Sequence, residues 1–275
     1  MPHPQVARVN ENNALASPST ALWGHNGSKA AYRVTLVRHG ETYQNRNQVV
    51  QGQDPSQGRL TPEGMRQAQL LAIALRERPF DIVYCSPLER AVLTMALLLV
   101  PRAGDRTLPI RFLPELMEIN QGVLHGKSHV EWKAAMVGHD PMAFSAADGE
   151  SWLDVQARVT RCLREAILPA GYPNILIVAH GGVNRGMLAS LTGLSMAEAW
   201  RGAGQGCPQD NTCVNHLELD AAGNLLSAVV NDSSHLAGEF PFATPGQRWH
   251  ATERRWEVLG APDKRHRNVE FNPYG

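Results

Sequence analysis

The chain lacks an excess of charge of either sign and contains few cysteines. Its 275 residues carry 26 basic and 26 acidic side chains, so the formal net charge is zero. Because no overall field would attract nucleic acid or an acidic membrane, we expect no nucleic-acid partner. The four cysteines show no C-x-x-C spacing. They predict reduced, mostly buried thiols in a cytoplasmic protein, although Cys207 and Cys213 lie close enough in sequence to form a bridge.

Long apolar runs are also absent. No run reaches the roughly 18 residues that a membrane-spanning helix needs, so we expect no membrane partner. Residues 1–30 are rich in Asn, Ser, Ala and Pro and lack the charged and apolar regions of a signal peptide. We therefore predict a flexible N-terminal arm at 1–30, one α/β domain at 31–232 and a C-terminal extension at 233–275. The extension is expected to pack on the domain, to shape the mouth of its active site, or to join a partner subunit in a homodimer.

Polar residues follow the first predicted strand directly. Residues 34–37 are apolar and β-branched, as in a buried strand, and Arg38-His39-Gly40 comes next. An arginine can grip two phosphate oxygens, a glycine lets the backbone approach closely, and a histidine can act as nucleophile or proton carrier. The tripeptide alone fits a phosphate site and a structural strand cap equally well. Further polar groups follow where open α/β sheets place their ligand crevice: Asn45, Gln51 and Gly52.

Two predicted helices come next, and the second contains an arginine in an unfavourable place. Thr61 caps the first helix, whose apolar stripe should face the sheet. The stripe consists of Met65, Ala68, Leu71, Ala72 and Leu75. After a strand at 81–85, Ser86 and Glu89 form a capping-box pattern, and Arg90 falls in the first turn. A helix N-terminus favours anions, so a bound anion would explain Arg90, whereas an ordinary surface arginine is the alternative.

A candidate proton donor follows the third predicted strand, at 110–112. Glu118 lies among apolar residues in a loop punctuated by Gly122 and Gly126. Such a setting can desolvate a carboxyl group and help it to remain protonated near neutral pH, as a general acid requires. Glu115 stands three residues earlier and is the alternative acid.

A second strand ends in the same way as the first. Residues 174–179 form the clearest buried strand, and His180-Gly181-Gly182 follows it. Two strand ends of this kind can meet at the same edge of a sheet, so the pair indicates a site far more strongly than either does alone. Residues 214–219 and 225–230 then predict a hairpin.

These motifs, taken in order, resemble the histidine phosphatase superfamily, the phosphoglycerate-mutase-like proteins. The resemblance spans about residues 33–230 and rests on these matching pieces: Arg38-His39-Gly40-Glu41-Thr42, Asn45, Gln51-Gly52, Leu60-Thr61-Pro62-Glu63-Gly64, Gln67-Ala68, Ser86-Pro87-Leu88-Glu89-Arg90-Ala91, Thr94, Glu118, Gly122, Gly126, Gly149-Glu150-Ser151 and Ala179-His180-Gly181-Gly182. Each piece is unspecific, but the ordered set is specific. It implies an α/β protein, a three-layer α/β/α sandwich with a mostly parallel sheet.

The resemblance also implies a role for each matching residue. His39 would attack phosphorus and form a phosphohistidine; it must then be neutral, with its other ring nitrogen donating to a backbone carbonyl near Gly40. Glu118 would protonate the leaving oxygen. Positively charged or polar groups would surround the phosphoryl oxygens: Arg38, Arg90 and His180. Neutral groups would bind the substrate: Asn45, Gln51, Gly52 and the backbone at Gly181. No metal or other cofactor is implied.

The spacing of the motifs favours the compact phosphatase branch. Glu118 and His180 are only 62 positions apart in the sequence, whereas the family's mutases carry a long insertion there. We therefore expect a phosphomonoesterase acting on a small phosphorylated metabolite. A phosphoglycerate-type mutase and a non-catalytic phospho-ligand-binding module are the alternatives. One departure concerns His125, which stands in Leu124-His125-Gly126 where the family often has an acidic or amide residue.

Overall fold

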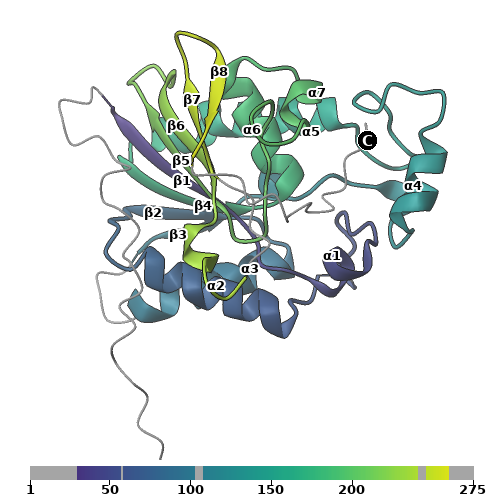
Figure 1. Ribbon diagram of the computed structural model, residues 1–275, viewed down its shortest axis with the longest axis horizontal. Coiled ribbons are helices and arrows are strands. Elements are labelled where there is room, and N and C mark those ends of the chain that lie inside the picture. Colours follow the sequence, from purple (N-terminus) through teal and green to yellow (C-terminus); the bar gives the residue numbers. More distant parts are fainter. Residues whose placement is uncertain (1–29, 57, 103–107, 241–245, 260–275) are drawn as a thin grey trace, which may run out of the picture.

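An eight-stranded sheet lies at the centre of the protein (Figure 1). The computed structural model describes residues 30–56, 58–102, 108–240 and 246–259. Their strands are β1 (Tyr32–Arg38), β2 (Ile82–Cys85), β3 (Ile110–Phe112), β4 (Asn174–Ala179), β5 (Val214–Leu219), β6 (Leu225–Asp232), β7 (Gln247–His250) and β8 (Arg255–Val258). The order across the sheet is β3-β2-β4-β1-β5-β6-β7-β8. The first four of these strands pair in parallel, and the sheet continues from β1 in antiparallel pairs.

Helices cover both faces of the sheet, which confirms the predicted three-layer α/β/α sandwich. The helices are α1 (Tyr43–Asn47), α2 (Pro62–Ala74), α3 (Glu89–Leu99), α4 (His129–Ala135), α5 (Trp152–Cys162), α6 (Gly181–Thr192) and α7 (Met196–Ala199). Helices α2 and α3 lie below the sheet in Figure 1, and α5, α6 and α7 lie on its other side. Helices α1 and α4 lie beyond the strand ends, where they flank the site described below.

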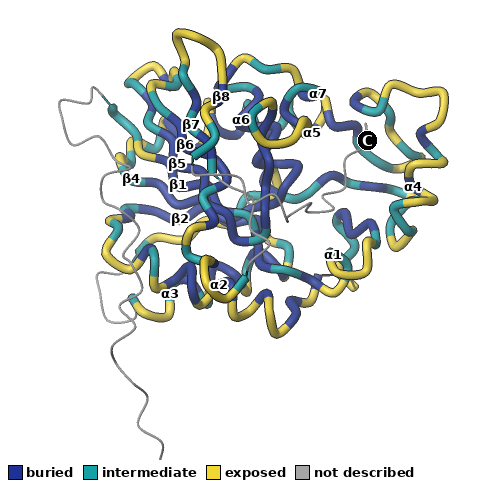
Figure 2. Tube along the Cα trace, viewed as in Figure 1, coloured by how far each residue is buried: buried dark blue, intermediate teal, exposed yellow. Residues whose placement is uncertain are grey.

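Two apolar clusters fill the spaces between these layers. The larger joins strand residues such as Leu36 and Ile177 to residues of α5 and α6 such as Val155 and Met187. The smaller joins the other face of the strands to α2 and α3. Figure 2 shows the inner strands β1, β2, β4 and β5 buried along most of their length, so alternate side chains of each of them serve different layers. This explains why the inner parallel strands β2 and β4 are almost wholly apolar rather than alternating.

The predicted stripe of α2 is wrong at its first position. Met65 is 43% exposed, although Ala68, Leu71 and Leu75 are buried as expected. Gly64 instead takes the buried position of the first turn, where a Cβ would lie 2.0 Å from the carbonyl oxygen of Glu41. This close approach of backbone to backbone turns Met65 toward solvent.

The described part of the C-terminal extension adds to the sheet. Strand β7 pairs with β6, and β8 pairs with β7. The rings of Trp249 and Trp256 lie 4.7 Å apart and join the larger cluster. The predicted N-terminal arm, apart from Ala30, and the basic residues at 264–267 lie outside the described residues.

All four cysteines are free and buried, which confirms the predicted thiols. Burial raises the pKa of the Cys85 and Cys207 thiols to about 12. Within the ranges that the structure describes, no helix is both long enough and apolar enough to cross a membrane.

We predict that Ile177→Ala destabilises the fold strongly. Ile177 is fully buried on β4, so the substitution loses buried apolar surface and leaves a cavity, at a cost of about 2–5 kcal/mol. Urea unfolding monitored by tryptophan fluorescence measures this loss. Ile73→Ala is the matched control because Ile73 is 56% exposed. Equal losses for the two variants would contradict the assignment of the core.

Candidate active site

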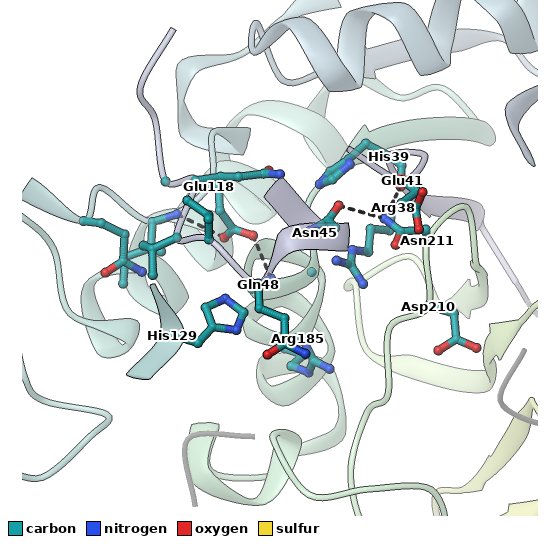
Figure 3. Close-up of a pocket in the computed structure, with 18 of the residues that line it drawn as sticks. Arg38, His39, Glu41, Asn45, Gln48, Glu118, His129, Arg185, Asp210 and Asn211 are labelled. Atoms are coloured by element: carbon teal, nitrogen blue, oxygen red, sulfur yellow. Dashed lines mark hydrogen bonds between the residues drawn. The ribbon is translucent and has the colours of Figure 1, made fainter. Parts of the chain in front are cut away.

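The ends of β1, β4 and β2 bring the predicted residues together. In the sheet register Arg38 pairs with Ala179 and Cys85 pairs with Val178, so the residues that follow these strands are neighbours. The rings of His39 and His180 lie 5.2 Å apart. Figure 3 shows His39, Arg38 and Asn45 on one side of a cavity and Glu118 on the other. The cavity measures about 420 Å³.

His39 is held as a neutral imidazole. Its Nδ1 donates to the carbonyl oxygen of Gly40 at 2.7 Å, which confirms the predicted contact. Burial, together with the charges of Arg90 and Arg38, lowers the pKa of His39 well below its ordinary value. The backbone is fixed as well, because Gly40 N–H donates to Thr94 Oγ1 at 3.0 Å. The ring therefore keeps Nε2 as the nitrogen with a free lone pair, as a nucleophile requires.

Arg90 and His180 form a buried pair behind His39. Arg90 Nε donates to His180 Nδ1 at 3.2 Å, so the neutral tautomer of His180 carries its proton on Nε2. That nitrogen lies 2.7 Å from Ser86 Oγ. Burial and the charge of Arg90 lower the pKa of His180 well below its ordinary value, and burial lowers the pKa of Arg90 to about 10. Arg90 thus stays charged at neutral pH, but neither side chain of the pair is among those that line the cavity.

The predicted capping box at Ser86 is wrong. Helix α3 begins at Glu89, its N-cap is Leu88, and no side chain caps it. The Ser86 hydroxyl pairs with His180 Nε2 at 2.7 Å and accepts the Leu88 N–H, outside the helix, at 3.3 Å. A local pattern predicted the cap, whereas a tertiary contact recruited the hydroxyl.

Two arginines approach the first turn of α6. A Cβ placed on Gly181 would lie 3.4 Å from both Arg38 Nε and Arg185 Nη1. Arg38 donates through Nη1 to the carbonyl oxygen of Gln209, and its Nε makes no hydrogen bond within the described residues. The Arg185 guanidinium lies 4.1 Å over the ring of Trp200. Sequence reasoning missed Arg185, although its position four residues after Gly181 places the two on one helix face.

Glu118 rather than Glu115 reaches the cavity. Its Oε2 accepts the Gly182 N–H at 3.1 Å, and its Oε1 accepts the Ile119 N–H at 3.0 Å. Glu118 lines the cavity, whereas Glu115 is exposed and is not among the lining residues. The geometry therefore favours Glu118 as the proton donor.

The predicted neutral groups all line the cavity, in different ways. Asn45 Oδ1 accepts from Thr42 N–H at 3.2 Å and from Asn211 Nδ2 at 3.3 Å, which leaves the Asn45 amino group as the donor available to a ligand. The Gln51 side chain donates to Thr42 Oγ1. Gly52 adopts a left-handed conformation, with φ of 51°, and its carbonyl oxygen accepts from Arg90 Nη2 at 2.8 Å.

Sequence reasoning also missed the segment before β5. Asn211 Nδ2 donates to the carbonyl oxygen of His39 at 3.1 Å, and Thr212 N–H donates to the same oxygen at 3.2 Å. Val214 pairs with Val37, so the start of the predicted strand at 214 was a signal that residues just before it adjoin His39.

Aromatic side chains make up much of the remaining wall. Trp132, Trp152 and Trp200 line the cavity while also packing in the core. Leu236 and Phe240 line it as well, and both belong to the C-terminal extension. An ion pair of 2.5 Å between Glu239 and Arg66 joins this segment to α2. The described start of the extension thus forms part of the wall.

Comparison with known proteins agrees with this geometry. The model of the histidine phosphatase superfamily (branch 1) matches residues 34–232. The chain belongs to this superfamily. It is 34% identical over 186 residues to the adenosylcobalamin/alpha-ribazole phosphatase of Escherichia coli K12, a match that covers 64% of this chain and 87% of the relative.

The chain is also similar to a second curated relative and to a solved structure. A Yersinia pestis protein named probable phosphoglycerate mutase GpmB is 34% identical over 212 residues, which are 74% of this chain and 94% of that protein. The crystal structure of the alpha-ribazole phosphatase from Shigella flexneri superposes with a TM-score of 0.63 at 31% identity. That match covers 73% of this chain and 96% of the solved one. Leu236 and Phe240 lie beyond the residues that the family model matches.

We predict that Gly182→Ala impairs the site. A Cβ at this position would lie 2.1 Å from Trp152 and 2.6 Å from Glu118 Oε1, so the carboxyl group must shift. Because a misplacement of about 1 Å can cost on the order of a hundredfold in rate, we expect a loss of kcat of that order. The measurement is steady-state hydrolysis of a phosphomonoester. Gly202→Ala is the control, since a Cβ there has no heavy atom within 4 Å; a fully active Gly182→Ala enzyme would contradict the packing described.

Proposed function

We propose that the protein is a metal-independent phosphomonoesterase of the histidine acid phosphatase type that acts through a phosphohistidine on His39. One observation carries the proposal: a neutral imidazole, oriented by the carbonyl oxygen of Gly40, borders a cavity whose opposite wall holds Glu118. A nucleophile and a proton donor on opposite sides suit in-line transfer of a phosphoryl group. The phosphatase names borne by its relatives support the same reaction.

The reaction has two balanced steps. The His39 Nε2 lone pair attacks phosphorus and the bond from phosphorus to the ester oxygen breaks, while the Glu118 carboxyl group gives its proton to that oxygen. An alcohol leaves and a phosphohistidine remains. A water molecule then attacks phosphorus, the Glu118 carboxylate takes its proton, and the phosphorus–nitrogen bond breaks. Inorganic phosphate leaves, and His39 and Glu118 return to their starting states.

Charge stabilisation comes from groups that are already in place. Arg38 Nε has no protein partner within the described residues, and the Asn45 amino group is likewise available to a phosphoryl oxygen. The N-terminus of α6 at Gly181 adds backbone donors and a positive helix end. Arg90 does not line the cavity, but its positive charge acts on the site and helps to keep the His39 imidazole neutral. Donors fixed before the reaction cost no reorganisation in the transition state.

The substrate we propose is a small metabolite that carries one phosphate ester. A cavity of about 420 Å³ lies within the range of small-molecule sites and exceeds what a phosphoryl group alone would fill. The alpha-ribazole phosphatase relatives make alpha-ribazole phosphate the first compound to test, alongside phosphoserine and phosphosugars. The buried free thiols support a cytoplasmic location. The homodimer stays a prediction.

A phosphoglycerate mutase is the second candidate, because Yersinia relatives bear the name probable phosphoglycerate mutase. A mutase must hold its intermediate away from water long enough to return the phosphate to a second hydroxyl. The short stretch between Glu118 and His180 and the absence of an insertion there favour hydrolysis instead. A non-catalytic binding module would need neither the oriented His39 nor the facing Glu118.

We predict that the purified enzyme releases phosphate from phosphomonoesters and that His39→Ala abolishes the release. Rapid quenching during turnover of a ³²P-labelled substrate should trap acid-labile, alkali-stable label on His39.

The phosphate-release assay is repeated with a phosphoglycerate in the presence and absence of its bisphosphate primer. Isomerisation that outpaces phosphate release would contradict the phosphatase, and activity without a trapped phosphohistidine would contradict the nucleophile.

We predict opposite behaviour for the two candidate acids. Glu118→Gln should slow the formation of phosphohistidine from alkyl phosphates, measured by rapid quenching within a single turnover, by roughly 10²–10⁴-fold, because their leaving alkoxides require a proton. This measurement excludes the hydrolysis of the phosphohistidine, in which Glu118 acts as base whatever the substrate was. The loss should be much smaller with 4-nitrophenyl phosphate, whose leaving group departs without a proton. Glu115→Gln is the matched control and should retain wild-type rates with both substrates. The assignment fails if Glu118→Gln lowers both rates equally or if Glu115→Gln reproduces its effect.

A further inference from the structure

One nitrogen of His125 joins the two loops that carry the site. His125 Nε2 accepts the Gln53 N–H at 3.1 Å and the Gln121 N–H at 3.1 Å. Gln53 belongs to the loop after α1, and Gln121 belongs to the loop that carries Glu118. Both donors are main-chain groups, which can only donate. Nε2 must therefore be unprotonated, and the proton of the neutral ring lies on Nδ1.

The first loop positions Arg90. Gly52 adjoins Gln53, and its carbonyl oxygen accepts from Arg90 Nη2 at 2.8 Å. A Cβ on Gly52 would lie 2.2 Å from His125 Nε2, so the imidazole packs directly against this backbone. With φ of 51°, Gly52 also occupies a conformation that other residues adopt only with strain. His125 thus fixes the backbone that holds the buried arginine.

The second loop positions Glu118. Gln53 Nε2 donates to the Glu118 carbonyl oxygen at 2.7 Å, and Gly126 N–H donates to the Val50 carbonyl oxygen at 2.9 Å. These bonds run between the same two loops as those of His125. The position of the proton donor relative to Arg90 therefore depends on this junction.

We propose that His125 is a positioning residue whose unprotonated Nε2 holds the Gly52–Gln53 backbone to the Glu118 loop and so makes the active site sensitive to acid. We call its two hydrogen bonds, from Gln53 N–H and Gln121 N–H, the clasp. The inference rests on the proposed phosphatase function. Protonation of Nε2 would place an N–H against two N–H donors and open the clasp. An amide oxygen in the same place has two lone pairs and could accept both bonds at any pH.

Two charged groups act on the His125 ring besides its burial. Burial lowers the pKa of His125 from its ordinary value; Arg90 lowers it further, and Asp54 opposes the shift. A lowered pKa means that the folded protein favours the neutral ring. The clasp is then complete above the ordinary pKa of about 6.5 and is lost as the pH falls below it toward the lowered value.

The test compares His125→Gln, which keeps an acceptor, with His125→Leu, which removes it at similar volume. At about pH 8, His125→Gln should retain kcat within about threefold, whereas His125→Leu should lose on the order of tenfold to a hundredfold in kcat with a smaller change in KM. On acidification, the activity of His125→Gln should persist to a lower pH than that of the wild type. The ionisation of the substrate is common to all variants and cancels in the ratio of their rates. His139→Gln, on an exposed loop, is the matched control.

The outcomes distinguish failure of the proposal for His125 from failure of the proposed phosphatase function. Urea unfolding at about pH 8 shows whether each variant is folded, and imidazole ¹⁵N spectra of the wild type report which nitrogen of His125 carries the proton. Three outcomes would each overturn the proposal. The first is a folded His125→Leu variant with the kcat of the wild type, and the second is the same fall of kcat at low pH in the wild type and His125→Gln. The third is a proton on Nε2 of His125 at neutral pH. If the wild type hydrolyses no phosphomonoester while Nε2 is unprotonated, the proposed function fails and the clasp stands.

Discussion

The parallel pairing of β1 with β4 is the constraint on which the site depends. Arg38 lies opposite Ala179 in this register, so each strand ends with a histidine beside the other. A shift by one residue would turn every side chain of β1 to the opposite layer. Because both faces of this part of the sheet are packed by helices, such a shift would also disrupt both clusters. The fit of the core and the placement of His39 and His180 are therefore set by the same pairing.

The loops that leave these strands can converge because small residues let backbones meet. Gly40 and Gly64 show this best: a Cβ on Gly40 would lie 2.5 Å from the carbonyl oxygen of Gly64. The backbone at His39 is thus pressed against the start of α2, and the bond from Gly40 N–H to Thr94 ties it to α3. The candidate nucleophile is held by main-chain geometry on three elements. Its orientation does not require a bound substrate.

The sequence allowed the strand ends, the layer order and the His39–Gly40 contact to be predicted, because each depends on residues that are adjacent or follow a regular period. Ser86 and Met65 were wrong for the opposite reason. In both, a local pattern suggested one neighbour and the fold supplied another: His180 for Ser86, and solvent for Met65. Arg185 and the clasp at His125 could not be found in this way, since their partners are distant in sequence. The departure at His125 was visible, but its meaning required the two backbone donors.

His39, Arg38 and Arg90 each donate one hydrogen bond to a main-chain carbonyl oxygen. His39 donates to Gly40, Arg38 to Gln209 and Arg90 to Gly52. A carboxylate in any of these places would orient the group equally well, but it would offset the positive charge that a phosphoryl group needs. Beside His39 it would also favour the protonated ring and so remove the nucleophile. Carbonyl oxygens avoid both effects, because they carry only a partial charge. Glu118, whose charge acts on Arg90, is held instead by the backbone N–H groups of Ile119 and Gly182. These backbone partners thus allow one cavity to combine the positive charge of the arginines, a neutral His39 and the Glu118 carboxyl group.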